Sequence, residues 1–188
     1  MHKVNIELIL HQIKSKMKPE VLQQLATEFG SPLYVYDAEK IAFQYNRLQN
    51  AFSKVERFKV HYAVKALSNV SVLKYLKSLG SGLDTVSLQE VQLGLHAGID
   101  PKDIIYTPNG VSMEEIEEVA QLGVQINIDN LSILEQFGTK HPTIPVCIRI
   151  NPHVMAGGNA NISVGHIDSK FGISIHQLPH LVRIVENT

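Results

Sequence analysis

The sequence has very little cysteine and no long apolar run, and both absences exclude classes of protein. Cys147 is the only cysteine among 188 residues, so an internal disulfide framework is excluded. This low cysteine content fits a reducing compartment, and we expect a cytoplasmic protein. No run approaches the roughly 18 consecutive apolar residues that predict a membrane-spanning helix. The N-terminal stretch lacks a proper apolar region and a small-residue cleavage site, so we expect no secretory signal.

The sequence also lacks an excess of charge of either sign. Lysine and arginine number 17 against 18 acidic residues, giving a net charge of -1. Without a basic stripe to meet a phosphate backbone, we expect no nucleic-acid partner. Hydrophobic residues make up 44% and charged residues 19%, which predicts a folded core rather than disorder. The length suffices for one core and is short for two full domains.

Three short motifs that carry chemistry are missing. No G-x-G-x-x-G follows the first clear strand, so a dinucleotide-binding fold loses its main support. No G-K-[ST] follows Gly157 and Gly158, so a phosphate loop of that type is not predicted. His176 and His180 have H-x3-H spacing, but Pro179 lies between them and the H-E-x-x-H glutamate is absent. We therefore expect no metal site.

Short apolar runs alternate with amphipathic stretches along the chain. Strands are expected at residues 32–37, 58–65, 83–87, 104–107, 124–129 and 144–150. Helices are expected at residues 19–29, 38–53, 69–79, 88–97, 113–122 and 131–138, with a last helix from about residue 178 and a glycine-rich loop over 151–172. Repeated strand-helix units with short connections predict a parallel α/β fold.

Local signals support these helix boundaries. A serine followed three residues later by glutamate is a capping-box signature, and it occurs at Ser87 and at Ser112. Glycine is favoured just beyond a helix C-terminus, where a left-handed conformation often ends the helix. Three glycines occupy such places: Gly80, Gly98 and Gly123.

The length of the repeat favours a barrel. Each unit takes about 20–25 residues, close to the value for a (β/α)8 barrel of about 250 residues. Five strands between residues 58 and 150 could also form a doubly wound sheet, but a closed barrel needs eight. We expect an α/β fold that is a partial (β/α)8 barrel, roughly its first five units. Because the sequence stops within a helical pattern, we expect a truncated part whose open sheet edges would need covering by another chain.

The strand expected at residues 58–65 ends in a lysine. Alternation places Phe58, Val60, Tyr62 and Val64 on one face and the odd-numbered residues on the other. If the apolar face packs on helices, Lys65 lies inside at the C-terminal mouth, where the active sites of barrels lie. A desolvated lysine can attack an aldehyde. A lysine at a strand end can equally reach solvent, and the pattern alone leaves both readings open.

Two more charged residues lie opposite apolar faces of their strands, and alternation places Arg149 inward in a barrel. Asp84 lies opposite Leu83 and Thr85 in its short strand, and Arg149 lies opposite the apolar face of the fifth barrel strand. A buried arginine requires a partner, and Asp84 is a plausible one. A structural ion pair explains both residues as well as a binding role does. His61 lies deeper on the lysine face, where a packed imidazole is more common than a catalytic one.

Several segments resemble, in order, the fold-type III pyridoxal-phosphate (PLP) decarboxylases. HYAVKAL resembles the cofactor-lysine strand of that family, LDTVSLQE the next unit, and IIYTPNG the third. RINP followed by SKFGI resembles the segment after the fifth strand. The resemblance covers roughly residues 25–185. The family includes diaminopimelate, ornithine and arginine decarboxylases, and SKFGI favours the diaminopimelate group.

The resemblance implies roles for individual residues. Lys65 is the implied catalytic residue and binds PLP as a Schiff base. Ala63, Asp84 and Arg149 are implied to lie at the cofactor, the small Ala63 leaving room for the pyridine ring. The implied reaction is decarboxylation of meso-diaminopimelate to L-lysine.

The resemblance also implies an organisation for the whole protein. Residues 1–35 are expected to contribute to a second, β-rich domain, and residues 36–188 to form the first part of the PLP-binding barrel. The complete protein is implied to be a homodimer, whereas this chain alone is expected to lack activity. Three alternatives stay open: an ornithine, arginine or carboxynorspermidine decarboxylase, a non-catalytic PLP-binding homologue, and a plain α/β scaffold.

Overall fold

The computed structural model describes residues 17–154 and 171–188, and the chain divides into two compact units. The first unit extends to Phe58 and the second runs from Lys59 to Thr188. The first unit contains α2 (Pro19–Phe29) and α3 (Ala38–Ala51), both at the expected places. Within the described ranges, none of the helices is both long and apolar enough to span a bilayer. The expected assignment of residues 1–35 to a second domain stays a prediction.

The strand expected at residues 32–37 is wrong. This segment joins no ladder, and Tyr34 is 90% exposed. An alternating sequence forms a strand only where a neighbouring strand accepts its hydrogen bonds, and the described residues provide none here. The segment instead leads into α3, where the Asp37 side chain caps the helix by accepting from the Lys40 backbone N–H at 3.0 Å.

The second unit is built on a five-stranded sheet whose order follows the chain. Its strands are β1 (His61–Ala63), β2 (Gly82–Thr85), β3 (Ile104–Tyr106), β4 (Gln125–Ile128) and β5 (Val146–Ile148). All four neighbouring pairs are parallel. Doubly wound sheets reverse their strand order at a switch point, and this sheet does not. The expected partial barrel is therefore confirmed over the doubly wound alternative.

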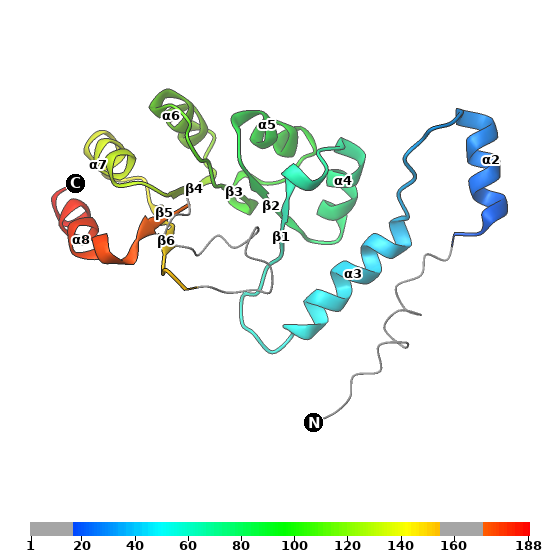
Figure 1. The fold of residues 1–188 in the computed structure, drawn as a ribbon, viewed down its shortest axis with the longest axis horizontal. Coiled ribbons are helices and arrows are strands. Elements are labelled where there is room, and N and C mark those ends of the chain that lie inside the picture. The colour runs from blue at the N-terminus through cyan, green and yellow to red at the C-terminus, as the bar shows by residue number, and fades with distance from the viewer. Residues whose placement is uncertain (1–16, 155–170) are drawn as a thin grey trace. The chain divides into compact units, whose positions relative to one another are not determined.

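Helices follow the strands and form an arc on one side of the sheet (Figure 1). They are α4 (Val70–Ser78), α5 (Leu88–His96), α6 (Met113–Gln121), α7 (Leu131–Lys140) and α8 (Leu178–Asn187). Each helix packs against the next one in the chain. Two short strands, β6 (Ile150–Asn151) and β7 (Ile173–Ser174), pair in parallel beyond β5. Helices on a single side are what a barrel wall requires.

The core lies between the strands and these helices, and it follows the expected alternation. Fully buried apolar strand residues are Leu83, Ile104, Tyr106, Ile126 and Ile128, and they pack with Val91, Val119 and Phe137 of the helices. The intervening residues, among them Asp84, Ile105 and Asn127, are only half-buried and lie on the opposite face. The sheet thus buries one face against helices and leaves the other for polar side chains.

The expected helix boundaries are confirmed. The Ser87 hydroxyl accepts from the Glu90 backbone N–H, and the Ser112 hydroxyl accepts from the Glu115 N–H, both at 3.3 Å. The predicted terminal glycines have positive φ angles of 94°, 83° and 75° at Gly80, Gly98 and Gly123. The strands are shorter than expected, and the region 144–150 is divided between β5 and β6.

Glu115 connects three elements through one carboxylate oxygen. Its Oε1 accepts from the Tyr106 hydroxyl at 2.8 Å and from the Leu88 backbone N–H at 3.0 Å. It therefore joins the start of α6 to β3 and to the start of α5. Burial raises the pKa of the Tyr106 hydroxyl, and the hydrogen bond and negative charge of Glu115 raise it further.

Tyr106 predicts a loss of stability at alkaline pH. A tyrosine in the unfolded chain ionises at about pH 10. The raised pKa of Tyr106 keeps its hydroxyl protonated at this pH in the folded protein. The stabilisation is complete below that pH, and the free energy of unfolding falls as the pH rises beyond it. We expect Tyr106→Phe to reduce this fall in urea unfolding between about pH 9 and 11. Tyr34→Phe, which removes an exposed phenol, should keep the wild-type slope; identical slopes in all three proteins would contradict the prediction.

Candidate functional site

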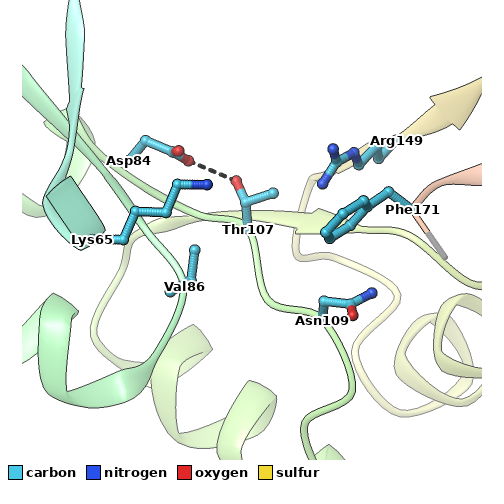
Figure 2. Close-up of a pocket in the computed structure, with 7 residues that line it drawn as sticks. All are labelled: Lys65, Asp84, Val86, Thr107, Asn109, Arg149 and Phe171. Carbon is cyan, nitrogen blue, oxygen red and sulfur yellow. Dashed lines mark hydrogen bonds between the residues drawn. The ribbon is translucent and has the colours of Figure 1, made fainter. Parts of the chain in front are cut away.

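A pocket of about 450 Å³ opens at the C-terminal ends of the strands. It is lined by Lys65, Asp84, Val86, Thr107, Asn109, Arg149 and Phe171 (Figure 2). This end of the sheet is where barrel enzymes place their active sites. The volume lies within the range of about 300–1,000 Å³ that is usual for small-molecule sites.

Lys65 reaches the pocket from a turn rather than from a strand. β1 ends at Ala63, and Val64–Ala66 form a 3-10 turn whose buried Val64 is 0% exposed. The expected strand at residues 58–65 therefore ends two residues early, and Lys65 is exposed at the mouth of the sheet. Its amine nevertheless points into the pocket, toward Asp84 and Thr107 (Figure 2).

Asp84 lies on β2 and points into the pocket, on the face opposite Leu83 and Thr85 that alternation predicted. The Thr107 hydroxyl donates to its Oδ1 at 2.9 Å, and Asn127 Nδ2 donates to the same hydroxyl oxygen at 3.0 Å. Sequence reasoning missed Thr107. It directly follows β3 and shares the inward parity of Ile105, so a polar residue at that strand end was the available signal.

Arg149 enters the pocket from the end of β5, but the expected ion pair with Asp84 is absent from the described residues. Its half-buried guanidinium instead lies over the Phe171 ring, 4.6 Å from the centroid. Gly172 makes this contact possible, because its φ is 81° and an added Cβ would meet the Asn151 backbone nitrogen at 2.9 Å. A flat guanidinium stacks on an aromatic face while its N–H groups stay available.

The charge of the pocket suits an anion. Among its seven lining residues, Lys65 and Arg149 carry positive charge and Asp84 is the only carboxylate. Val86 adds an apolar surface below the lysine (Figure 2). Charged N–H donors on two sides of one concave site favour a ligand with phosphate or carboxylate groups.

Ala63 and His61 belong to β1, the strand that leads to Lys65. Ala63 is half-buried and does not line the pocket, so its contact with a cofactor stays a prediction. The His61 ring lies against Gly82 of β2, where an added Cβ would stand 2.5 Å from a ring carbon. Burial lowers the pKa of the His61 imidazole, and the Lys59 ammonium lowers it further.

Two of the histidines that follow the fifth strand lie close together in the structure. The rings of His153 and His176 stack with centroids 5.2 Å apart, and His153 Nε2 lies 2.7 Å from Ser174 Oγ. Within the described part of the chain, no three potential metal-ligating side chains come together. His166 and the glycine pair at 157–158 lie outside the described residues.

A lysine amine, a carboxylate and a guanidinium at the C-terminal mouth of a barrel sheet define a site of the kind in which a lysine can bind an aldehyde cofactor. The comparison with known families agrees with this geometry. Residues 38–188 match the family described as pyridoxal-dependent decarboxylase, pyridoxal binding domain. The chain therefore belongs to the pyridoxal-dependent decarboxylases, and the expected family is confirmed.

Individual relatives support the same assignment. The chain is 40% identical over 163 residues to diaminopimelate decarboxylase from Methanothermobacter thermautotrophicus, covering 86% of this chain and 38% of the relative. The structure of the M. jannaschii diaminopimelate decarboxylase in complex with L-lysine is 31% identical with a TM-score of 0.76, covering 87% and 40% of the two chains. A lysine/ornithine decarboxylase from Vibrio vulnificus, 23% identical over 89% of this chain and 42% of its own with a TM-score of 0.72, shows the fold alone. The chain thus spans about 40% of the length of these relatives.

Gly82 of β2 packs closely against His61 of β1 and the backbone of Asp103, so a larger residue at position 82 should lower the free energy of unfolding. A methyl group at position 82 would meet the backbone oxygen of Asp103 and the ring of His61. Because a backbone atom cannot move aside cheaply, we expect Gly82→Ala to lower the free energy of unfolding by about 1–3 kcal/mol. Gly138→Ala in α7 is the control, since the three atoms nearest its new methyl all belong to the Thr188 side chain and none to the backbone. Equal urea midpoints for the two variants would contradict the close packing of Gly82 against His61 and Asp103.

Proposed function

We propose that Lys65 binds PLP and that the polypeptide containing this sequence decarboxylates meso-diaminopimelate to L-lysine. One observation carries the proposal: the amine of Lys65 and the side chains of Asp84 and Arg149 converge in a single pocket at the C-terminal mouth of the sheet (Figure 2). Membership of the pyridoxal-dependent decarboxylases supports it.

The pocket residues suit PLP chemically. PLP combines an aldehyde with a phosphate, and the pocket combines one accessible amine with a surplus of positive charge. Lys65 would bind the aldehyde, and Arg149 would attract anionic groups with N–H donors that Phe171 leaves available. Asp84 would accept hydrogen bonds from a cationic group of cofactor or substrate. When bound, PLP supplies an electron sink for breaking the bond to the substrate carboxylate.

The substrate is proposed on the basis of similarity. RINP with SKFGI favours the diaminopimelate group, and the 40% identity to a diaminopimelate decarboxylase agrees with it. Since the chain spans about 40% of such relatives, we propose that the remaining site groups come from outside this sequence. Homodimer formation is likewise proposed from the resemblance, and a cytoplasmic location from the low cysteine content.

The role of Lys65 can be tested by covalent labelling. We expect the complete polypeptide containing this sequence to show an absorbance band with PLP, and borohydride reduction to fix a pyridoxyl group on Lys65. Lys65→Ala should lose both the band and the label, because Lys65 carries the only amine among the described residues that line the pocket. Lys74→Ala, which removes an exposed lysine of α4, should keep both. A label found at another lysine would refute the assignment.

The substrate can be tested by measuring carbon dioxide release from three amino acids. We expect release from meso-diaminopimelate to exceed release from ornithine or arginine by at least about tenfold in kcat/KM, which corresponds to about 1.4 kcal/mol of differential transition-state binding. Preference for ornithine or arginine would reassign the enzyme within the family. Labelling of Lys65 without release from any of the three would indicate a PLP-binding homologue without this activity.

A further inference from the structure

Three polar side chains form a row across neighbouring strands on the inward face of the sheet. Asp84 belongs to β2, Thr107 directly follows β3, and Asn127 belongs to β4. Asn127 Nδ2 lies 3.0 Å from Thr107 Oγ1, which lies 2.9 Å from Asp84 Oδ1. The row therefore begins deep between strands and ends in the pocket, beside the amine of Lys65 (Figure 2).

The hydrogen atoms in this row have only one consistent arrangement when Asp84 is ionised. An ionised carboxylate only accepts, so the single hydroxyl hydrogen of Thr107 must point to Asp84. The Thr107 oxygen must then accept from its other neighbour. Asn127 can only donate through its NH2 group, which sets the orientation of its amide.

This orientation leaves the other end of Asn127 without a partner. Its Oδ1 is buried and accepts no hydrogen bond in the described part of the chain. A reversed amide would give Oδ1 the Thr107 hydrogen, but Asp84 would then lose its donor. An unsatisfied buried acceptor is unfavourable. The arrangement therefore gives the Asp84 carboxylate a hydrogen bond at the cost of one for the Asn127 amide oxygen.

The middle of the row is held firmly by the backbone. The Thr107 backbone N–H donates to the Thr85 carbonyl at 2.8 Å, which extends the ladder between β2 and β3. A β-branched side chain on such a backbone has few rotamers. Asp84 Oδ2 accepts no hydrogen bond from the described residues, so one oxygen is held and the other stays available to the pocket.

We propose that Asn127 and Thr107 are positioning residues that hold Asp84 Oδ1 and so direct its free oxygen at the PLP-bearing end of Lys65. The proposal rests on the proposed function and deepens it, because it assigns the orientation of the site carboxylate to two residues outside the resemblance-based set. Thr107 and Asn127 act through Asp84 and make no step of the reaction themselves.

The affinity for PLP of the complete polypeptide tests this role. A hydrogen bond to a charged group is strong enough that we expect Thr107→Val to raise the Kd of PLP by about tenfold. Thr107→Ser, which retains the hydroxyl, should stay within about threefold of wild type, and Asn127→Asp, which removes the donor, should follow Thr107→Val. Thr139→Val on the exposed face of α7 is the matched control and should leave the Kd unchanged.

Dependence on Asp84 separates positioning from a merely structural hydrogen bond. In an Asp84→Asn background, Thr107→Val should raise the Kd no further, because the residue acts through the carboxylate. An equal rise with and without Asp84 would overturn the proposal, as would a Thr107→Val protein that binds PLP like wild type.

A second readout needs no cofactor. In the cofactor-free protein, the Asn127 side-chain NH2 signals should shift and exchange faster in Thr107→Val and should be restored in Thr107→Ser, as followed by 15N NMR. Unchanged signals would show that the row does not exist and would overturn the proposal. Failure of the wild-type protein to form the Lys65 adduct is visible before any variant is made, and it would overturn the proposed function together with this role.

Discussion

The site depends on one constraint, which is that each parallel strand can bury only one of its faces against the helices. Leu83 and Ile104 are fully buried on the helix side, and this packing turns Asp84 to the opposite face. Shifting the register of β2 by one residue would move the aspartate into the apolar core. The hydrophobic burial that stabilises the sheet therefore also places its polar groups in one pocket.

Periodicity predicted most of the fold, because alternation and helical spacing report which face of an element is apolar. It also placed Lys65 and Asp84 at the right end of the sheet. It failed at residues 32–37, where an alternating pattern found no neighbouring strand, and at the end of β1, where a 3-10 turn replaces the last strand residues. Both failures have the same cause: local pattern carries no information about hydrogen-bond partners supplied by distant segments.

The contacts within the pocket were predicted least well, for a related reason. Arg149 was expected to pair with Asp84, yet the structure brings Phe171, more than twenty residues later, beneath its guanidinium. Charge complementarity suggested the ion pair, but the pairing of β6 with β7 places Phe171 near Arg149. Thr107 was overlooked because a lone threonine at a strand end has no distinctive pattern until Asp84 and Asn127 are seen on either side of it.

The shared oxygen of Glu115 has a consequence for how the molecule opens. Because this one atom holds a buried hydroxyl of β3 and the first N–H of α5, releasing α6 from the sheet would leave both donors without their acceptor. The second and third strand-helix units are therefore joined into one cooperative block, rather than fraying one at a time. That block contains Asp84 and Thr107, whereas Lys65 stands on a short 3-10 turn outside it, so the two sides of the pocket belong to different parts of the sheet.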